Sequence, residues 1–389
     1  MKHLLVAALL SVALAACESE SLQPDYGRSL PSGASALIPL GPGEPRPDYA
    51  GDWSQRQAIL PALDRSIEWT SKASAARHFP IAGISHERAL KSLQRFREIL
   101  TTSPSAADFK QQLDKEFTVY KSAGWDGAGG GVLFTGYCTP ILDGSRERTD
   151  VCRYPLYALP PDLAKDKDGN ILGQQTASGL QPYPDRRTIE SSGLLAGKGL
   201  ELAWLKSPLD AYIAHVNGSA VIRLPDGALF RLGYAGKNRS PYTSLRGELV
   251  RDGKLKAEEA NLASIREWAA AHPDEVPAYL ARNASYVFFT PIEGNPRGSL
   301  NVEVSPERTL ATDKALFPRG AITFVDSRPP SGTRRNAKPF HSIMFDQDTG
   351  EAIRTAGRAD IYLGMGPAAE RLAGATEEEG QLYYLFLAK

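Results

Sequence analysis

The sequence predicts a mainly β protein with flanking helices. Residues 132–235 and 341–362 contain short apolar runs of strand length, separated by Gly, Pro and Asp turn residues. Residues 55–69, 85–100 and 256–282 carry apolar side chains at helical spacing. The chain of 389 residues exceeds one typical domain, and 42% apolar with 23% charged residues is an ordinary globular composition, so we expect two domains.

The charge balance gives no general attraction to a polyanion. Lys plus Arg and Asp plus Glu each total 45, so no strong overall field favours nucleic acid or an anionic membrane surface as a partner. We expect no nucleic-acid partner, and the partner must be inferred from particular sites.

The N-terminus has the pattern of an exported lipoprotein. An apolar run too short to span a bilayer follows Met1-Lys-His3, so residues 1–16 are predicted to be a signal peptide. Leu-Ala-Ala-Cys17 resembles a bacterial lipobox, and a tri-acylated Cys17 would anchor stably because more than one acyl chain makes attachment durable. The alternative is a small-residue cleavage site with an incidental Cys. Glu18 after the Cys permits sorting to the outer membrane, and we expect its periplasmic face.

The segment between the signal peptide and the glycine-rich break at residue 127 is predicted to be a tether followed by helices. Residues 17–51 are rich in Pro, Gly and Ser, and we expect a flexible tether that need not fold. Helices are expected over 55–69, from a Ser85 cap to residue 100, and after Ser105, whose partner Asp108 suggests a capping-box variant. We expect these helices to buttress the core.

Strand-like sequence follows the glycine-rich break at residues 127–131 and continues, with turns, to about residue 235. Helical periodicity returns over 256–271 and 273–282, and residues 286–289 are predicted to be a buried strand.

The last strand-like run places two aspartates close together in sequence. Residues 341–345 and 359–362 are predicted to be short strands, with Asp348-Thr-Gly as the turn between them. Asp348 and Asp360 then lie on adjoining strands, where one carboxylate raises the pKa of the other. The alternative is that Asp348 caps the turn and Asp360 is a surface residue.

Several other blocks accompany these aspartates in a fixed order. They are residues 136–140 (Gly-Tyr-Cys-Thr-Pro), 144–146, 154–157, 184–186, 215–219 (His-Val-Asn-Gly-Ser), 234–238 (Tyr-Ala-Gly-Lys-Asn) and 283–289. Together with Asp313, Asp348 and Asp360, this arrangement resembles the membrane-bound lytic transglycosylase A (MltA) family, whose 3D element contributes three aspartates. The resemblance extends from about residue 54 to the C-terminus.

The resemblance implies a fold and a domain division. A large domain with a double-psi β-barrel would comprise residues 52–136 and 290–389, with the 3D element at 305–389. A smaller β-domain would be inserted at residues 137–289.

The resemblance also implies the chemistry. A glycosidic bond is cleaved by protonating the leaving oxygen, and the acid must keep its proton near neutral pH. A peptidoglycan lytic transglycosylase needs one carboxylate, because the 6-hydroxyl of MurNAc attacks its own anomeric carbon and gives a 1,6-anhydro end. The family pattern places this acid and base at Asp360, with Asp348 in support and Asp313 structural or groove-lining. From the residues alone, Asp348 and Asp360 are equally good candidates.

The resemblance further implies a sugar-binding groove, with peptidoglycan glycan strands as the substrate. Its expected contact residues are Asp313, Thr135, Gly136, Tyr137, Asn217, Gly218, Ser219, Tyr234, Lys237, Ala356 and Gly357. Tyr137 or Tyr234 would offer a stacking or hydrogen-bonding face; taken singly, packing is the commoner role for such an aromatic residue. Glu351 replaces a usual Gly beside Asp348, and a further acid there would raise the pKa of the cluster or weaken glycan binding.

Cysteine and histidine spacing gives no metal site, and we expect no cofactor. The six histidines lack the spacing of a zinc site. In an oxidising compartment Cys138 and Cys152 could close a disulfide; two free buried thiols are the alternative.

Two other functions remain open from the sequence alone. One is a hydrolytic glycosidase on the same type of barrel, which would release reducing ends. The other is a non-catalytic peptidoglycan-binding lipoprotein. Recruitment to a cell-wall synthesis or division complex is a further possible partnership, with the membrane contacted through the lipid anchor alone.

Overall fold

The structure is a computed structural model that describes residues 23–166, 171–257, 259–327 and 340–389. Within these ranges no helix combines the length and apolar character needed to cross a membrane. The predicted signal peptide and Cys17 lie outside the described residues.

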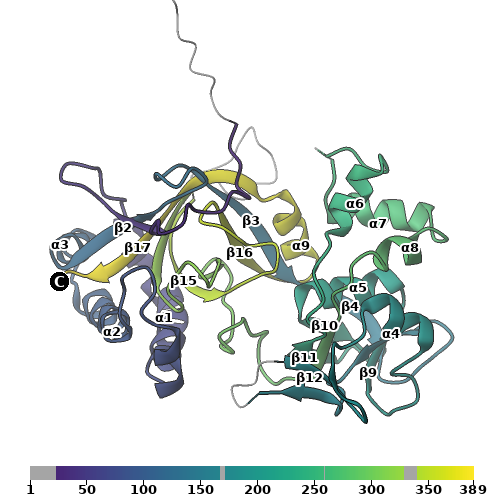
Figure 1. Ribbon diagram of the computed structural model, residues 1–389. Coiled ribbons are helices and arrows are strands. Elements are labelled where there is room, and N and C mark those ends of the chain that lie inside the picture. The colour runs from purple at the N-terminus through teal and green to yellow at the C-terminus, as the bar shows by residue number, and fades with distance from the viewer. Residues whose placement is uncertain (1–22, 167–170, 258, 328–339) are drawn as a thin grey trace, which may run out of the picture.

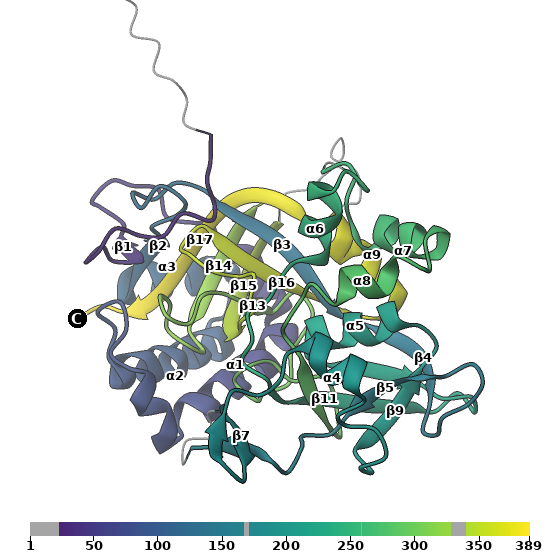
Figure 2. The same ribbon diagram turned by 45° about the vertical axis from the view of Figure 1, so that its right-hand side comes forward.

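Eight strands form the larger sheet. They are β1 (Leu37–Pro39), β2 (Phe117–Ser122), β3 (Val132–Thr139), β13 (Thr309–Ala311), β14 (Ile322–Ser327), β15 (Phe340–Asp348), β16 (Arg358–Met365) and β17 (Glu377–Leu387). Their order is β1-β2-β17-β14-β15-β13-β16-β3. The first residues of β17, 377–380, also pair with β3, so the series from β14 to β3 returns to β17 (Figure 2). The predicted mainly β architecture is confirmed.

The two aspartate-bearing strands are not neighbours. Both strands predicted around the Asp348 turn exist, as β15 and β16, but β13 lies between them. β13 pairs in parallel with β15 and antiparallel with β16. The expected pairing of adjoining strands is therefore wrong, because a three-residue strand from earlier in the chain occupies the position between them.

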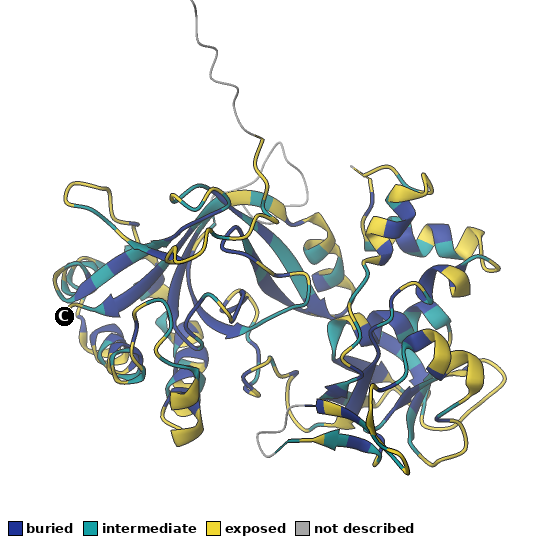
Figure 3. Ribbon diagram, viewed as in Figure 1, coloured by how far each residue is buried: buried dark blue, intermediate teal, exposed yellow. Residues whose placement is uncertain are grey.

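Three helices cover one face of this sheet. They are α1 (Arg56–Thr70), α2 (His86–Thr102) and α3 (Ala106–Glu116). Their buried side chains, including Phe96 and Phe109, pack with Phe324 and Phe345 of the sheet, while the outer helix faces are exposed (Figure 3). The Ser85 and Ser105 side chains accept hydrogen bonds from backbone N–H groups three residues on, and so cap α2 and α3. The three predicted helices are confirmed.

The segment predicted to be a tether contributes to the fold before residue 51. β1 pairs antiparallel with β2. Tyr49 is fully buried, and its hydroxyl donates to Asp114 of α3. The prediction that this part need not fold is wrong, because an aromatic side chain and a strand edge are satisfied there by the sheet and its helices.

A second sheet lies beside the first, joined to it where β3 leads into β4 (Figures 1 and 2). Its strands are β4 (Ile141–Ser145), β5 (Tyr154–Tyr157), β9 (Glu201–Leu205), β10 (Ala220–Arg223), β11 (Leu229–Lys237) and β12 (Val287–Pro291), in the order β12-β11-β10-β4-β9-β5. A small third sheet comprises β6 (Leu163–Lys165), β7 (Ile171–Thr176) and β8 (Gly179–Gln181).

Helices interrupt the region that was predicted to be strand-like throughout. They are α4 (Arg186–Ser192) and α5 (Pro208–Asn217). Asp185 and Ser207 cap them, accepting from Thr188 N at 2.8 Å and Asp210 N at 3.0 Å. These local caps outweigh the strand-like composition around them.

The remaining helices flank the junction of the two sheets. They are α6 (Leu245–Arg251), α7 (Leu262–Ala271), α8 (Val276–Leu280) and α9 (Gly366–Ala375), with short 3-10 turns η1 (Ala50–Gln55) and η2 (Ala73–His78) elsewhere. α7 begins later than predicted because Asn261 caps it, accepting from the N–H groups of Ala263 and Ser264.

Candidate active site

Strand β3 presents alternate side chains to two different environments, as the two-residue period of a strand requires. Tyr137 donates to Asp348 at 2.7 Å, and the Thr139 and Tyr362 hydroxyls lie 3.2 Å apart, so these side chains share the face that carries the aspartates. Gly136 faces α9 instead, where a Cβ would come within 2.9 Å of the Ala373 Cα. Gly136 therefore serves close packing of strand against helix.

The strand register brings the two aspartates toward one neighbourhood. Ala311 of β13 is the Cα partner of Asp348 on one side and of Asp360 on the other. Adjacent strands are about 4.8 Å apart, so the Cα atoms of Asp348 and Asp360 are separated by roughly 10 Å. Asp360 is also the Cα partner of Thr135 on β3.

Asp360 has few partners for its charge. Its side chain is partly exposed, but its Oδ1 atom is buried and has no hydrogen-bond partner among the described residues. Burial raises the pKa of Asp360 to about 7, and the Asp348 charge raises it further, while hydrogen bonding by Thr135 and the Arg358 charge oppose the rise. Near neutral pH this carboxyl can both give and take a proton.

Asp348 is bonded on all sides. It accepts from the Tyr137 hydroxyl at 2.7 Å, the Ser299 N–H at 2.7 Å and the Thr349 N–H at 2.8 Å. Burial raises its pKa, and these three donors and Lys314 oppose the rise. Three donors suit the ionised form, so Asp348 is placed to hold neighbouring groups in position.

Asp313 has a structural environment. It is 7% exposed and accepts from the N–H groups of Ala315, at 2.9 Å, and Thr355, at 3.1 Å. The nearest Arg354 nitrogen is 3.8 Å away. The Ala315 bond closes a local turn after β13, and the Thr355 bond ties that turn to the chain before β16, so Asp313 fixes the loops beside the site.

Two residues expected along the sugar path are in the interior. Ala356 is fully buried in the main apolar core. Gly357 is buried, and a Cβ there would come within 2.9 Å of the Trp125 Cα. Their expected role as groove contacts is not supported, because Ala356 has no exposed surface and Gly357 packs closely against Trp125.

The second sheet contributes two of the predicted blocks to one place. Asn217 donates to the Ile213 carbonyl, and Gly218 ends α5 with a φ of 66°, in the left-handed region that glycine tolerates. A Cβ on Gly218 would lie 3.7 Å from the Tyr234 ring. Ser219 is buried at 8% exposure, whereas Tyr234 is 53% exposed. Of these residues, Tyr234 offers the largest accessible surface.

Lys237 and Glu351 connect the two sheets. Lys237 ends β11 in the second sheet, Glu351 follows β15 in the first, and their side chains form an ion pair. Glu351 therefore has a cationic partner, which differs from the expected addition of a further unpaired acid to the aspartate cluster.

The two cysteines are free and buried, so the possible disulfide is absent from the structure. Cys138 lies on β3 and Cys152 in the loop between β4 and β5. Burial raises the pKa of the Cys138 thiol to about 12, so it is neutral under ordinary conditions.

Sequence reasoning missed Arg358 and Tyr362, which flank Asp360 at two-residue spacing on β16. Arg358 donates to the Thr135 hydroxyl at 3.2 Å, and the Tyr362 ring lies 5.2 Å from that of Tyr137. The alternation of a strand was the available signal, because residues two apart share a face.

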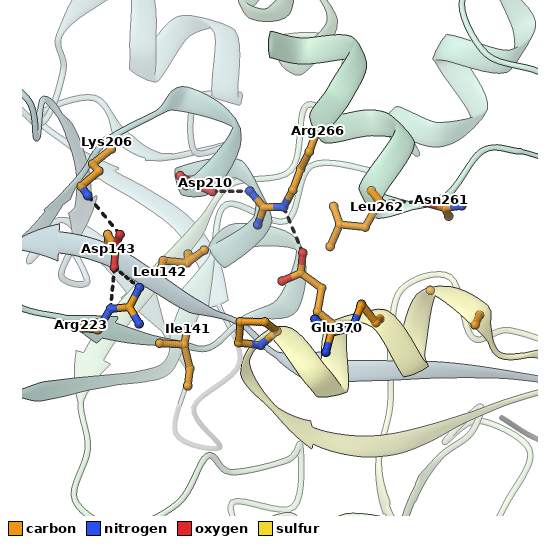
Figure 4. Close-up of a pocket in the computed structure, with 15 residues that line it drawn as sticks. Ile141, Leu142, Asp143, Lys206, Asp210, Arg223, Asn261, Leu262, Arg266 and Glu370 are labelled. Carbon is orange, nitrogen blue, oxygen red and sulfur yellow. Dashed lines mark hydrogen bonds and ion pairs between the residues drawn. The ribbon is translucent and has the colours of Figure 1, made fainter. Parts of the chain in front are cut away.

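A separate cavity of about 580 Å³ lies at the junction of the two sheets, and neither Asp348 nor Asp360 is among its lining residues (Figure 4). It is lined by β4, β10, α5, α7 and α9. Arg266 of α7 crosses it, donating to Asp210 at 2.7 Å and to Glu370 of α9 at 3.0 Å. These ion pairs fasten the second sheet's helices to α9.

Comparison with known proteins gives consistent matches. The MltA specific insert domain matches residues 133–290, and the 3D domain matches residues 308–386. The chain is 31% identical over 263 residues to the membrane-bound lytic murein transglycosylase A of Vibrio cholerae. That match spans 66% of this chain and 66% of the relative, slightly under two thirds of the relative's length.

Solved structures extend the match over nearly the whole chain. A membrane-bound lytic murein transglycosylase from Agrobacterium tumefaciens has a TM-score of 0.75 and 28% identity, covering 90% of this chain and 98% of that chain. Escherichia coli MltA with bound chitohexaose has a TM-score of 0.68 and 25% identity, covering 93% of this chain and 98% of that chain.

Proposed function

Because the chain belongs to the MltA family of lytic murein transglycosylases, we propose that it is a peptidoglycan lytic transglycosylase, a lyase that uses Asp360 as its single acid and base. It would cleave the β-1,4 bond between MurNAc and GlcNAc and leave a 1,6-anhydro-MurNAc end. The family resemblance drawn from the motifs is confirmed by the two domain matches and the relatives.

The observation that carries this mechanism is the environment of Asp360. Its pKa of about 7 leaves a substantial fraction protonated at neutral pH, as a general acid requires. In the first step Asp360 gives its proton to the glycosidic oxygen, and GlcNAc departs as positive charge develops at the anomeric carbon of MurNAc.

In the second step the same group acts as a base. The Asp360 carboxylate takes the proton of the MurNAc 6-hydroxyl while that oxygen bonds to the anomeric carbon. The proton returns to Asp360 and no water is consumed. Asp348 supports this assignment because three donors hold its oxygens, leaving it as a positioning group.

Glycan strands would run past the β3 and β16 face toward the second sheet. We infer contacts with Thr135 and Tyr137 on one side, and with Tyr234 beside Gly218 and Lys237 on the other. The exposed Tyr234 ring supports a sugar contact. The solved complex of the E. coli relative with chitohexaose supports an oligosaccharide as the ligand class.

The fold and location expected from the sequence also belong to this proposal. The return of the strand series to β17, with parallel pairs β13–β15 and β16–β3, supports a double-psi β-barrel. The insert-domain match supports a smaller domain near residues 137–289 within a large domain of 52–136 and 290–389. Relatives named membrane-bound support attachment to a membrane. The lipobox-like sequence that ends at Cys17 would provide this attachment as a lipid anchor, at the periplasmic face of the outer membrane.

The test is digestion of purified peptidoglycan by the wild-type protein and by Asp360→Asn, with products identified by mass spectrometry. We expect muropeptides one water lighter than hydrolysis products, and a rate loss of roughly 100- to 10,000-fold in the variant. The control is Asp326→Asn, a partly exposed acid on β14 outside the site, which should keep full activity. Reducing-end products would instead show hydrolysis, and a folded wild-type protein that binds glycan without products would show a binding module.

A further inference from the structure

Two buried polar groups on β16, one of them an oxygen of the reacting carboxyl, lack partners among the residues that the structure describes. They are the Nε–H of Arg358, a donor, and the Oδ1 of Asp360, an acceptor; neither is hydrogen-bonded within the described part of the chain. The two residues are two apart on β16, so their side chains leave the same face of the strand. Buried polar groups are normally paired, and an unpaired donor on the same strand face as an unpaired acceptor needs an explanation.

The far end of Arg358 is already fixed. Its Nη2 donates to the Thr135 hydroxyl oxygen at 3.2 Å. Thr135 is the Cα partner of Asp360 across the β3–β16 pairing, and hydrogen bonding by Thr135 opposes the rise in the pKa of Asp360. A hydroxyl that accepts from Arg358 keeps its own proton for Asp360. Arg358 thus orients the Thr135 hydroxyl as a donor toward the acid.

We propose that Arg358 is a positioning residue whose Nε–H pairs with Asp360 Oδ1 each time Asp360 becomes ionised. This inference rests on the proposed function, in which Asp360 alternates between acid and carboxylate. Both groups are unpaired within the described residues, and we assign this open arrangement to the form in which Asp360 holds its proton. Once the proton has passed to the leaving oxygen, a charge-assisted hydrogen bond forms. It breaks when the 6-hydroxyl proton returns, and Arg358 keeps all its own protons throughout.

The pairing would limit how strongly burial raises the pKa of Asp360. A cation close to a carboxyl favours its charged form. Without such a partner Asp360 would bind its proton too tightly to release it to the leaving oxygen. With Arg358 as its partner, the Asp360 carboxyl can act as the acid and then as the base near neutral pH.

Other charged groups around the pair act in known directions. Asp348, two strands away, raises the pKa of Asp360. Glu377 of β17 and Arg246 on α6 act on Arg358 with opposite signs. The Tyr137 and Cys138 side chains remain neutral because burial holds their pKa values high. Arg358 is therefore the cation that acts most directly on Asp360.

The test compares Arg358→Gln, which removes the charge, with Arg358→Lys, which keeps it, in the full chain. The matched control is Arg354→Gln, an exposed cation near Asp313. The first readout is the pH dependence of kcat for release of anhydro products. In Arg358→Gln we expect the alkaline limb of this pH profile to move to higher pH by about one unit. The limb of Arg358→Lys should lie between those of Arg358→Gln and the wild type. The limb of Arg354→Gln should not move. If Arg358→Gln has a lower kcat but its alkaline limb stays at the wild-type pH, the proposal is overturned.

The second readout does not need turnover. Carbon-13 NMR titration of the Asp360 side-chain carboxyl gives its pKa in each folded variant, and we expect it to rise in Arg358→Gln by the same amount. An unchanged value would overturn the pairing. Should Arg358→Gln not fold, Arg358→Lys decides alone, because it lacks the Nε–H and its Asp360 pKa must still exceed that of the wild type. Absence of anhydro products from the wild type would defeat the proposed function, while the titration would still decide the pairing.

Discussion

The C-terminal part of β15 and the middle of β16 carry acidic side chains in contrasting surroundings. On β15, Asp348 has three donors, and the fully buried Asp346 is bonded by Thr312, Tyr384 and Lys314. On β16, Asp360 keeps a buried oxygen with no partner among the described residues.

This difference separates the carboxylates of β15, which hold the structure in place, from the carboxyl group of Asp360, which takes part in the reaction. Donors to both oxygens of a buried carboxylate offset part of the cost of burying its charge, and they hold its neighbours in place. A carboxyl with an unpaired buried oxygen is destabilised as an anion and keeps a proton that can be used. Substitutions on β15 should therefore change stability and alignment, whereas substitutions on β16 should change the chemistry.

The largest stability effect is expected at Asp346. Asp346→Asn would leave Lys314, 5% exposed, as a buried charge without its anion, and breaking such a pair costs about 3–5 kcal/mol. Urea unfolding measures this loss. The control Asp326→Asn should change the free energy of unfolding by less than about 0.5 kcal/mol. A loss at Asp346 no larger than at Asp326 would contradict the framework role of β15.

Asp348→Asn should weaken activity without abolishing it. Misalignment of Tyr137 and the chain at Ser299 should reduce kcat by roughly 10- to 100-fold. Removing the negative charge also lowers the pKa of Asp360, so the alkaline limb of the pH profile should move to lower pH. A limb that moves to higher pH would show that Asp348 does not raise the pKa of Asp360.

Asp360 should destabilise the fold at high pH. Its pKa rises from an ordinary value of 3.8 to about 7 on folding, so the folded protein binds more protons between these values. The stability contributed at low pH is lost as pH rises through 7. Asp360→Asn cannot ionise and should be more stable than the wild type at pH 8 by ~1–2 kcal/mol, a figure reduced for partial exposure. The advantage should disappear at pH 4, and thermal unfolding at both pH values measures it.

The smallest effect is expected at the ion pair between the sheets. Both Lys237 and Glu351 are about one third exposed, so Lys237→Ala should cost less than about 1 kcal/mol, and less still at high salt. A larger, salt-independent loss in unfolding experiments would mean that this contact fixes the two sheets far more strongly than a surface pair can.

Local signals predicted local structure well. Ser85 and Ser105 mark the starts of α2 and α3 because a cap acts on backbone groups within one turn. The strands that carry Asp348 and Asp360 were also found from their composition. The insertion of β13 between them was not, because its three residues give no distinct pattern and its position depends on pairing with distant strands.

The site could also be predicted only in part, because some of its contacts join residues that are far apart in the sequence. The motifs identified the aspartates, but whether a carboxyl finds donors depends on residues such as Ser299 and Lys314, which are distant in sequence. Whether Cys138 and Cys152 form a disulfide could not be predicted either, because their spacing does not give the directions of their side chains. Ala356 also belongs to the core rather than the groove, which only the packing reveals.

The most direct test of a single acid and base is digestion of peptidoglycan in water enriched in oxygen-18, followed by mass spectrometry of the MurNAc ends. If Asp360 directs the 6-hydroxyl oxygen to the anomeric carbon, the new ends carry no label and are one water lighter than reducing ends. Labelled reducing ends as the primary product would show that water attacks, and would contradict the role of Asp360 as the single acid and base of a transglycosylase.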